Sequence, residues 1–183
     1  NPANLARKPA ALAWDIAGGI AQAGQTAWYT VESLDLGDTD TVIVSAAVGG
    51  VGVFAAQLAQ RRGATVIGTA SEANHEFLRS IGIIPVSYGP GLVDRVRAVA
   101  PQEVTAVLDS SGRETIEAGL ALGVAPERIN TIVDSKLAAE LGVRNVGNST
   151  LKPGVIEELA GYIADGTFVI PLEQAFPLEE VVA

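Results

Sequence analysis

Residues 41–52 read Thr-Val-Ile-Val-Ser-Ala-Ala-Val-Gly-Gly-Val-Gly. The first five residues are mostly β-branched, which is typical of a buried strand, and the rest form a turn rich in Ala and Gly. Small apolar residues then recur at helical spacing up to Arg62, and Gly63 follows as a helix stop. The stretch therefore predicts a strand, a tight turn and a helix in direct succession.

The turn after this strand has the spacing of a phosphate-binding turn. Aligned on Gly49 and Gly52, it reads G-x-G-x-x-G with Ala47 in the place of the first glycine. Small residues are needed there because the chain turns tightly, a pyrophosphate approaches the backbone, and the helix packs closely on the strand. The free N–H groups at the helix start would face the pyrophosphate. The pattern predicts dinucleotide binding; a close-packed turn without a ligand is the alternative.

The rest of the chain alternates short apolar runs with helical patterns, which is typical of βαβ units. Further strands are expected at 65–70, 86–87, 104–108, 128–133, 144–146 and 168–170. Helices are expected at 12–34, 91–99, 112–122 and 153–165, and one after Ser71. We therefore predict an α/β fold: a Rossmann doubly wound parallel sheet of about six strands with helices on both faces.

Composition excludes several classes of protein. The 183 residues carry a net charge of -9, which disfavours nucleic acid and anionic membrane as partners. Zero Cys and one His leave no disulfide framework and no zinc site, so no metal is expected. No run is long enough to span a membrane, so we expect a cytoplasmic protein. Both ends read as cut, and we expect a helical lead-in from a catalytic domain over 1–35 and a Rossmann domain, truncated at its C-terminus, over 36–183.

The end of the second predicted strand bears on which dinucleotide is bound. Enzymes that use NAD usually carry Asp or Glu there, which accepts hydrogen bonds from the ribose hydroxyls. This chain has Ala70 and then Ser71, so no carboxylate at that position would repel a 2'-phosphate, although Glu72 follows. Ser71 can donate to a phosphate, and it can equally act as a helix N-cap. We therefore expect NADP(H) as the cofactor.

Segments spread along the chain carry a resemblance to a known family. They are 8–9, 12–14, 23–28, 46–52, 69–75 and 176–180. They resemble the medium-chain dehydrogenase/reductase superfamily, and within it the zinc-free quinone oxidoreductase (ζ-crystallin-like) group. The likeness runs from about Lys8 to the last residue and covers only that family's cofactor domain. Relatives usually read Leu-Pro-x-Ala-Gly-Leu-Thr where this chain reads Ile-Ala-Gln-Ala-Gly-Gln-Thr at 20–26, so this turn departs from the family's pattern.

The resemblance implies cofactor contacts at several positions. Thr26 matches a turn near the nicotinamide, Ile132 matches a strand end that faces it, and Ser110 lies beside the expected path of the cofactor. The pyrophosphate turn corresponds to Ala47, Gly49, Gly50, Val51 and Gly52. The 2'-phosphate site corresponds to Ser71, His75 and Tyr88. The segment 144–146 matches an edge strand that pairs with its copy in relatives, so the resemblance implies a homodimer.

Some of these residues have simpler interpretations. His75 can lie on an exposed helix surface, and Tyr88 can be a turn aromatic that covers the core. Asp109 ends a strand at the ligand edge, but a carboxylate there can also cap the helix that follows. Neither a Tyr-x-x-x-Lys pair nor a phosphate-binding Gly-x-x-x-x-Gly-Lys-Ser/Thr motif occurs. No residue can be assigned a catalytic role.

The resemblance implies an NADP-dependent, zinc-independent oxidoreductase that reduces a small-molecule quinone, enone or related carbonyl compound. In such relatives the cofactor supplies the hydride and the protein orients the reactants. The substrate pocket would lie largely in a further domain, so this chain alone should bind cofactor and turn over little. The alternative is a non-catalytic NADP(H)-binding module with a sensing or structural role.

Overall fold

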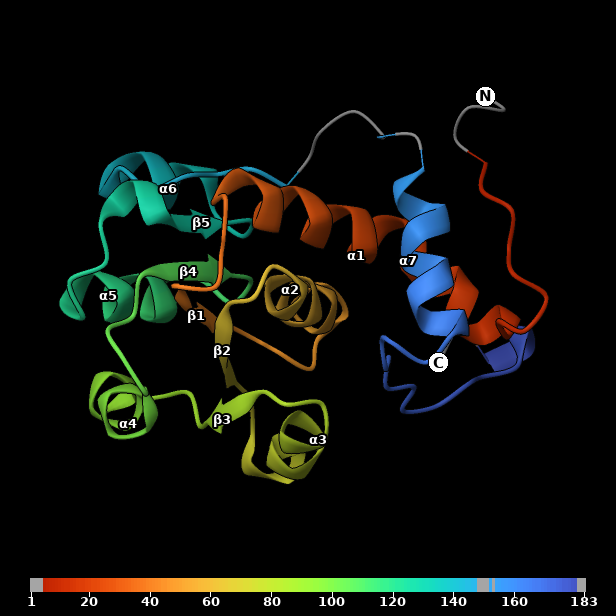
Figure 1. The fold of residues 1–183 in the computed structure, drawn as a ribbon, viewed down its shortest axis with the longest axis horizontal. Coiled ribbons are helices and arrows are strands. Elements are labelled where there is room, and N and C mark those ends of the chain that lie inside the picture. Colours follow the sequence, from red (N-terminus) through yellow and green to blue (C-terminus); the bar gives the residue numbers. More distant parts are fainter. Residues whose placement is uncertain (1–4, 148–151, 153, 181–183) are drawn as a thin grey trace.

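The computed structural model describes residues 5–147, 152 and 154–180, and within these residues five parallel strands form one sheet. The order is β3-β2-β1-β4-β5 (Figure 1). The strands are β1 (Thr41–Val44), β2 (Thr65–Thr69), β3 (Ile84–Val86), β4 (Ala106–Asp109) and β5 (Ile129–Thr131). Successive strands run outward from β1 to β3, and the chain then returns to the other side of β1 for β4. The predicted doubly wound Rossmann class is confirmed.

Helices cover both faces of the sheet. One face carries α1 (Trp14–Ser33), α2 (Gly50–Arg61) and α3 (His75–Ser80), and α7 (Val155–Ala164) packs against α1. The other face carries α4 (Leu92–Val99), α5 (Arg113–Ala121) and α6 (Ser135–Leu141). Short 3-10 turns complete the chain at Glu72–Asn74, Pro126–Arg128 and Leu178–Glu180. None of the helices in the described part of the chain is long and apolar enough to cross a membrane.

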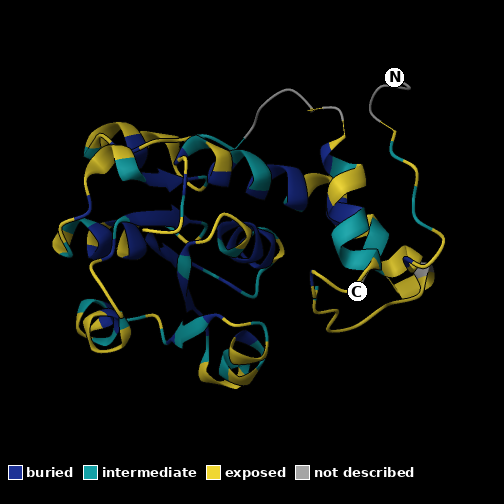
Figure 2. Cartoon of the chain, in the orientation of Figure 1, coloured by how far each residue is buried: buried dark blue, intermediate teal, exposed yellow. Residues whose placement is uncertain are grey.

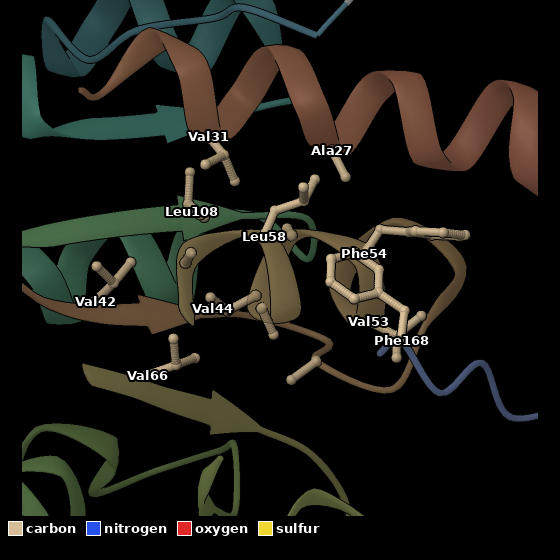
Figure 3. Packing of buried hydrophobic residues seen from close by; sticks show 14 of the residues in the cluster. Ala27, Val31, Val42, Val44, Val53, Phe54, Leu58, Val66, Leu108 and Phe168 are labelled. Carbon is tan, nitrogen blue, oxygen red and sulfur yellow. The ribbon is translucent and has the colours of Figure 1, made fainter. Parts of the chain in front are cut away.

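Two apolar clusters follow from the alternation of side chains along the strands. Val42 and Val44 point to the cluster under α1 and α2, whereas Ile43 points to the cluster under α4 and α5. In Figure 3 the first cluster brings sheet residues together with Val31, Leu58 and the ring of Phe54. Figure 2 shows that the central strands β1 and β4 are buried, whereas the edge strand β3 is only partly buried. A sheet buried on both faces explains why the strands read as continuous apolar runs.

The sheet differs from the prediction at its edge beyond β5. The predicted strand 144–146 makes a single isolated bridge, Asn130 to Arg144, and the predicted strand 168–170 is not a strand. Side chains replace the backbone pairing at both places, because Asn130 bonds to Val146 and Gln57 bonds to Val169. The described sheet therefore has five strands instead of about six.

Two further local features differ from the sequence analysis. Helix α6 is absent from the predicted elements, and it starts where the Asp134 carboxylate accepts hydrogen bonds from the amides of Lys136 and Leu137. Ser71 occupies the N-cap position considered from the sequence, but its side chain makes no cap bond, and its hydroxyl accepts a hydrogen bond from Asn74 Nδ2 at 3.1 Å. The start of the predicted lead-in (1–4), the first residue of the helix predicted over 153–165 and residues 181–183 of the predicted second domain lie outside the described residues.

Candidate functional site

The carboxyl edge of the sheet contains the point where the strand order reverses. Strand β1 continues into α2 on one face, whereas β4 continues into α5 on the other, so the two connections diverge. In open α/β sheets such a divergence leaves a crevice outside the carboxyl ends of the strands, where ligands bind. This geometry singles out the turn after β1 and the residues around it.

The turn after β1 is held by β2 and by close backbone packing. The amides of Ala46 and Ala47 donate to the hydroxyl and the carbonyl of Thr69, at 3.2 and 2.9 Å. Ala46 adopts a left-handed conformation (φ 47°), and its carbonyl accepts a hydrogen bond from the Gly49 amide at 2.8 Å. A Cβ on Gly52 would lie only 2.0 Å from that carbonyl oxygen. Gly52 therefore allows α2 to pack on the turn, as the motif predicts.

The first turn of α2 leaves its backbone amides uncapped. Gly49 is the N-cap and offers no side chain, and the first helical bond runs from Val53 N to Gly49 O at 3.0 Å. The amides of Gly50, Val51 and Gly52 come before that bond, where a helix has no internal acceptors to offer. The helix dipole adds roughly half a positive charge at this end. These free donors and this partial positive charge suit an anion, although the chain as a whole carries a net charge of -9.

A cleft of about 560 Å³ opens beside that helix start. Three residues predicted from the sequence, Thr26, Val51 and Ile132, line it together. They come from α1, α2 and the end of β5, so the fold gathers positions that lie far apart in the sequence. The lining residues that sequence reasoning missed are Gln22, Asn145, Val146 and Gly147.

Asp109 holds the ends of three strands together. Its buried carboxylate accepts hydrogen bonds from the hydroxyls of Ser45 at 2.9 Å and Thr131 at 2.7 Å. It also accepts from the amides of Ser111 at 3.1 Å and Gly112 at 3.0 Å, at the entrance to α5. The Ser110 amide in turn donates to Ser45 Oγ at 2.6 Å. These contacts fix the loop before α5 and do not cap the helix, whose N-cap is Gly112 without a side-chain cap bond, and the network positions Ser110 in that loop.

The three residues assigned to a 2'-phosphate lie after neighbouring strands. Ser71 follows β2 and His75 begins α3, while Tyr88 follows β3 with its side chain exposed. The ring of Tyr88 therefore does not cover the core. His75 is half-buried, and its Nε2 is buried without a hydrogen-bond partner among the described residues. His75 therefore does not lie on a fully exposed helix surface, which was its simpler interpretation.

Arg95 is a residue near this region that the sequence did not single out. Its guanidinium donates to the carbonyls of Ser87 at 2.8 Å, Gly89 at 2.7 Å and Pro90 at 2.8 Å. These bonds fix the loop that carries Tyr88. An arginine four residues into a predicted helix gives no sequence signal for such contacts, because they depend on how the preceding loop folds back.

Gly68 in β2 packs directly against Ala47 in the turn after β1. A Cβ there would lie 2.7 Å from Ala47 Cβ and 2.9 Å from Ile83 Cγ2. The sequence held a usable signal, because a glycine inside a strand often marks a close approach of another part of the chain.

Within the described residues no group of three or more His, Cys, Asp or Glu side chains is placed to hold a metal ion.

The chain was compared with protein-family profiles, curated proteins and solved structures. No family profile matches it. It is 41% identical over 93 residues to prostaglandin reductase-3 of Bos taurus, which covers 49% of this chain and 25% of that protein. The quinone oxidoreductase from Coxiella burnetii superposes with a TM-score of 0.82 at 25% identity, covering 97% of this chain and 57% of that one. The CurK enoyl reductase superposes with a TM-score of 0.76 at 27% identity, covering 98% of this chain and 60% of that one.

The three matched proteins have similar names, and each is longer than this chain. All three proteins are reductases by name, and this chain spans less than two thirds of the length of each. The superposed part contains the sheet, the turn after β1 and the cleft described above, since it covers nearly all of this chain. The chain is therefore similar to quinone oxidoreductase-like proteins of the medium-chain dehydrogenase/reductase superfamily, in agreement with the resemblance seen in its sequence, and it has the fold of the nucleotide-binding domain of such proteins.

Proposed function

We propose that this chain is the NADPH-binding domain of a zinc-independent oxidoreductase that reduces a quinone, enone or related carbonyl compound. The observation that carries the proposal is the cleft that joins the uncapped start of α2 to the end of β5. A dinucleotide needs donors for its pyrophosphate and, a few ångströms further, a partly apolar pocket for its nicotinamide. Val51 belongs to both features, so one extended ligand can occupy them together.

The pyrophosphate end of the proposed site fits an anion on physical grounds. The amides of Gly50, Val51 and Gly52 would donate to the phosphate oxygens. Ala47 is fully buried, and Gly49 has no side chain, so neither would obstruct the close approach of a phosphate to this backbone. The residues present therefore fit the group that the proposal requires.

The nicotinamide end would lie in the cleft between Thr26 and Ile132. Thr26 is buried and offers a hydroxyl, while Ile132 offers an apolar surface for one face of the ring. Bound there, the reduced nicotinamide would supply a hydride to the substrate. The chain's own contribution would be to orient the ring and to keep water from one of its faces.

The preference for NADPH over NADH is proposed from the ends of β2 and β3. Ala70 places no carboxylate at the ribose, and Ser71 and Tyr88 each offer a hydroxyl that can donate to a 2'-phosphate. His75 begins the helix that follows, but its Nε2 is buried and would have to be uncovered to reach a phosphate. A quinone or an enone is supported as the substrate by the names of the two superposed structures, a quinone oxidoreductase and an enoyl reductase.

Calorimetric titration of this chain with NADPH and NADH tests the proposal. NADPH should bind more tightly by about tenfold or more, because at least one charge-assisted hydrogen bond would be added. Tighter binding of NADH would refute the assignment of the 2'-phosphate site. Oxidation of NADPH by simple quinones or enones, measured on a longer protein that includes this chain, would separate an enzyme from a non-catalytic cofactor-binding module.

A further inference from the structure

The wall of the cleft beyond β5 is built in an unusual way. Backbone pairing between β5 and the following segment covers only Arg144, whose amide and carbonyl bond to Ile129 O at 2.9 Å and Thr131 N at 3.0 Å. The next three residues, 145–147, line the cleft. Their position therefore cannot come from a continued backbone ladder.

Beyond Arg144, hydrogen bonds from side-chain amides replace the backbone pairing with β5. Asn130, which is fully buried in β5, donates from Nδ2 to Val146 O at 2.9 Å and accepts from Val146 N at Oδ1 at 2.8 Å. Asn145 Nδ2 donates to Thr131 O at 2.7 Å. The Asn130 amide thus pairs with both polar groups of one backbone residue, as a neighbouring strand would.

The two bonds from the Asn130 side chain to the backbone of Val146 are called the Asn130 clamp below. The clamp holds residues 145–147, the wall of the cleft, close to Ile132. A Cβ on Gly147 would lie 2.5 Å from Ile132 Cγ2, so the segment passes directly against that side chain. Ile132 and Gly147 therefore form one continuous surface of the cleft. If the segment moved away, this surface would open and its backbone would have to be ordered again when a ligand binds, at an entropic cost.

We propose that Asn130 is a positioning residue for the nicotinamide end of the cofactor. It touches no ligand itself, and it acts by holding Val146 so that 145–147 stand as a preformed wall opposite Thr26. The inference rests on the proposed function, because it takes the cleft to be the nicotinamide site. It adds a residue that neither the glycine motif nor the family resemblance identifies.

The chain contains a matched control for this clamp. Gln57 in α2 is also buried, and its side chain makes the same pair of bonds to the backbone of Val169, at 3.1 Å to the carbonyl and 2.8 Å from the amide. Val169 does not line the cleft beside Ile132. Replacing Gln57 therefore removes an equivalent clamp and destabilises the fold without touching the proposed wall.

The test compares N130A, Q57A and the unsubstituted chain in their binding of two ligands. One ligand is NADPH, and the other is adenosine 2',5'-bisphosphate, which contains the adenosine end without the nicotinamide. N130A should weaken NADPH binding by about five- to thirtyfold, equal to about 1–2 kcal/mol at 1.4 kcal/mol per tenfold, and change bisphosphate binding by less than about twofold. Q57A should lower the melting temperature but change both affinities by less than about twofold.

A second variant keeps the test decisive if N130A folds poorly, and hydrogen exchange adds a further readout. N145A removes the bond from this cleft-lining residue to Thr131 O, and relative to the unsubstituted chain it should weaken NADPH binding by about two- to fivefold and leave bisphosphate binding unchanged. Amide hydrogen exchange without any ligand should be faster at Val146 in N130A and unchanged there in Q57A.

The outcomes separate the inference from the proposed function. Equal weakening of both ligands by N130A, or equal effects of N130A and Q57A on NADPH, would overturn the positioning role while leaving the cofactor site in place. Binding of neither ligand by the unsubstituted chain would overturn the proposed function and the inference with it.

Discussion

Replacing Gly52 by Ala tests the packing of α2 on the turn after β1. The added Cβ would lie 2.0 Å from Ala46 O, 2.7 Å from Ala46 C and 3.0 Å from Ser45 O. Ordinary contacts to a Cβ begin near 3.4 Å, so the helix or the turn must move by more than 1 Å. All three contacts are with backbone atoms, which cannot rotate away as a flexible side chain would.

The expected cost follows from two opposing terms. Overpacking a tight site costs about 1–3 kcal/mol, and a collision with backbone belongs at the upper end of that range. Alanine gains back up to about 1 kcal/mol in helix propensity relative to glycine. A net loss of about 2 kcal/mol predicts a melting temperature lower by about 4–8 °C for a domain of this size.

The assay is thermal and urea unfolding of G52A beside G161A. Gly161 is also a helical glycine, in α7, but a Cβ there meets nothing within 4 Å, so G161A should gain up to about 1 kcal/mol. The reasoning would be refuted by a G52A protein as stable as G161A. G52A should also lose NADPH affinity, because the amides of the α2 start would be displaced together with the helix.

Three more predictions concern the residues around the site and the stability of the fold. D109A should lower the free energy of unfolding in urea by about 3 kcal/mol, because the amides of Ser111 and Gly112 lose a buried acceptor. D94A, at an exposed surface position, is the control and should change the free energy of unfolding by less than about 0.5 kcal/mol. S71A and Y88F should each reduce the preference for NADPH over NADH by about tenfold in calorimetric titration without weakening NADH, and loss of both affinities together would contradict the 2'-phosphate assignment. Burial raises the pKa of Asp40, but hydrogen bonds from Thr105, the Gly37 amide and Arg128 outweigh it and hold that pKa below its ordinary value. The ionised Asp40 therefore contributes stability that is complete above its ordinary pKa and is lost as the pH falls through its lower folded value. The loss in free energy of unfolding caused by D40N should shrink below about pH 4. A loss that did not depend on pH would contradict this account.

The sequence predicted the central part of the fold because local and long-range signals agree there. The run from Thr41 to Gly52 has strand composition, a small-residue turn and a helical repeat, and each of these acts over a few residues. Thr26, Val51 and Ile132 were assigned by resemblance, and the structure brings these three residues to one cleft. Their roles in binding a cofactor remain predictions.

The parts that the sequence did not predict depend on contacts between distant side chains and backbone. Residues 144–146 have the composition of a strand, but Asn130 captures Val146 with its side chain and ends the ladder after one bridge. Residues 168–170 are held by Gln57 in the same way. Asn and Gln in buried positions are the only local sign of such clamps, and nothing in a single sequence indicates which backbone they bind.

The position of the cofactor on the chain is the central claim, and a titration of the ¹⁵N-labelled chain with NADPH, followed by amide chemical shifts, tests it most directly. The account predicts saturable shifts at Gly50, Val51 and Gly52, at Ile132 across the cleft, and at the residues after β2. Shifts confined to other surfaces, or no shifts at saturating NADPH, would contradict it.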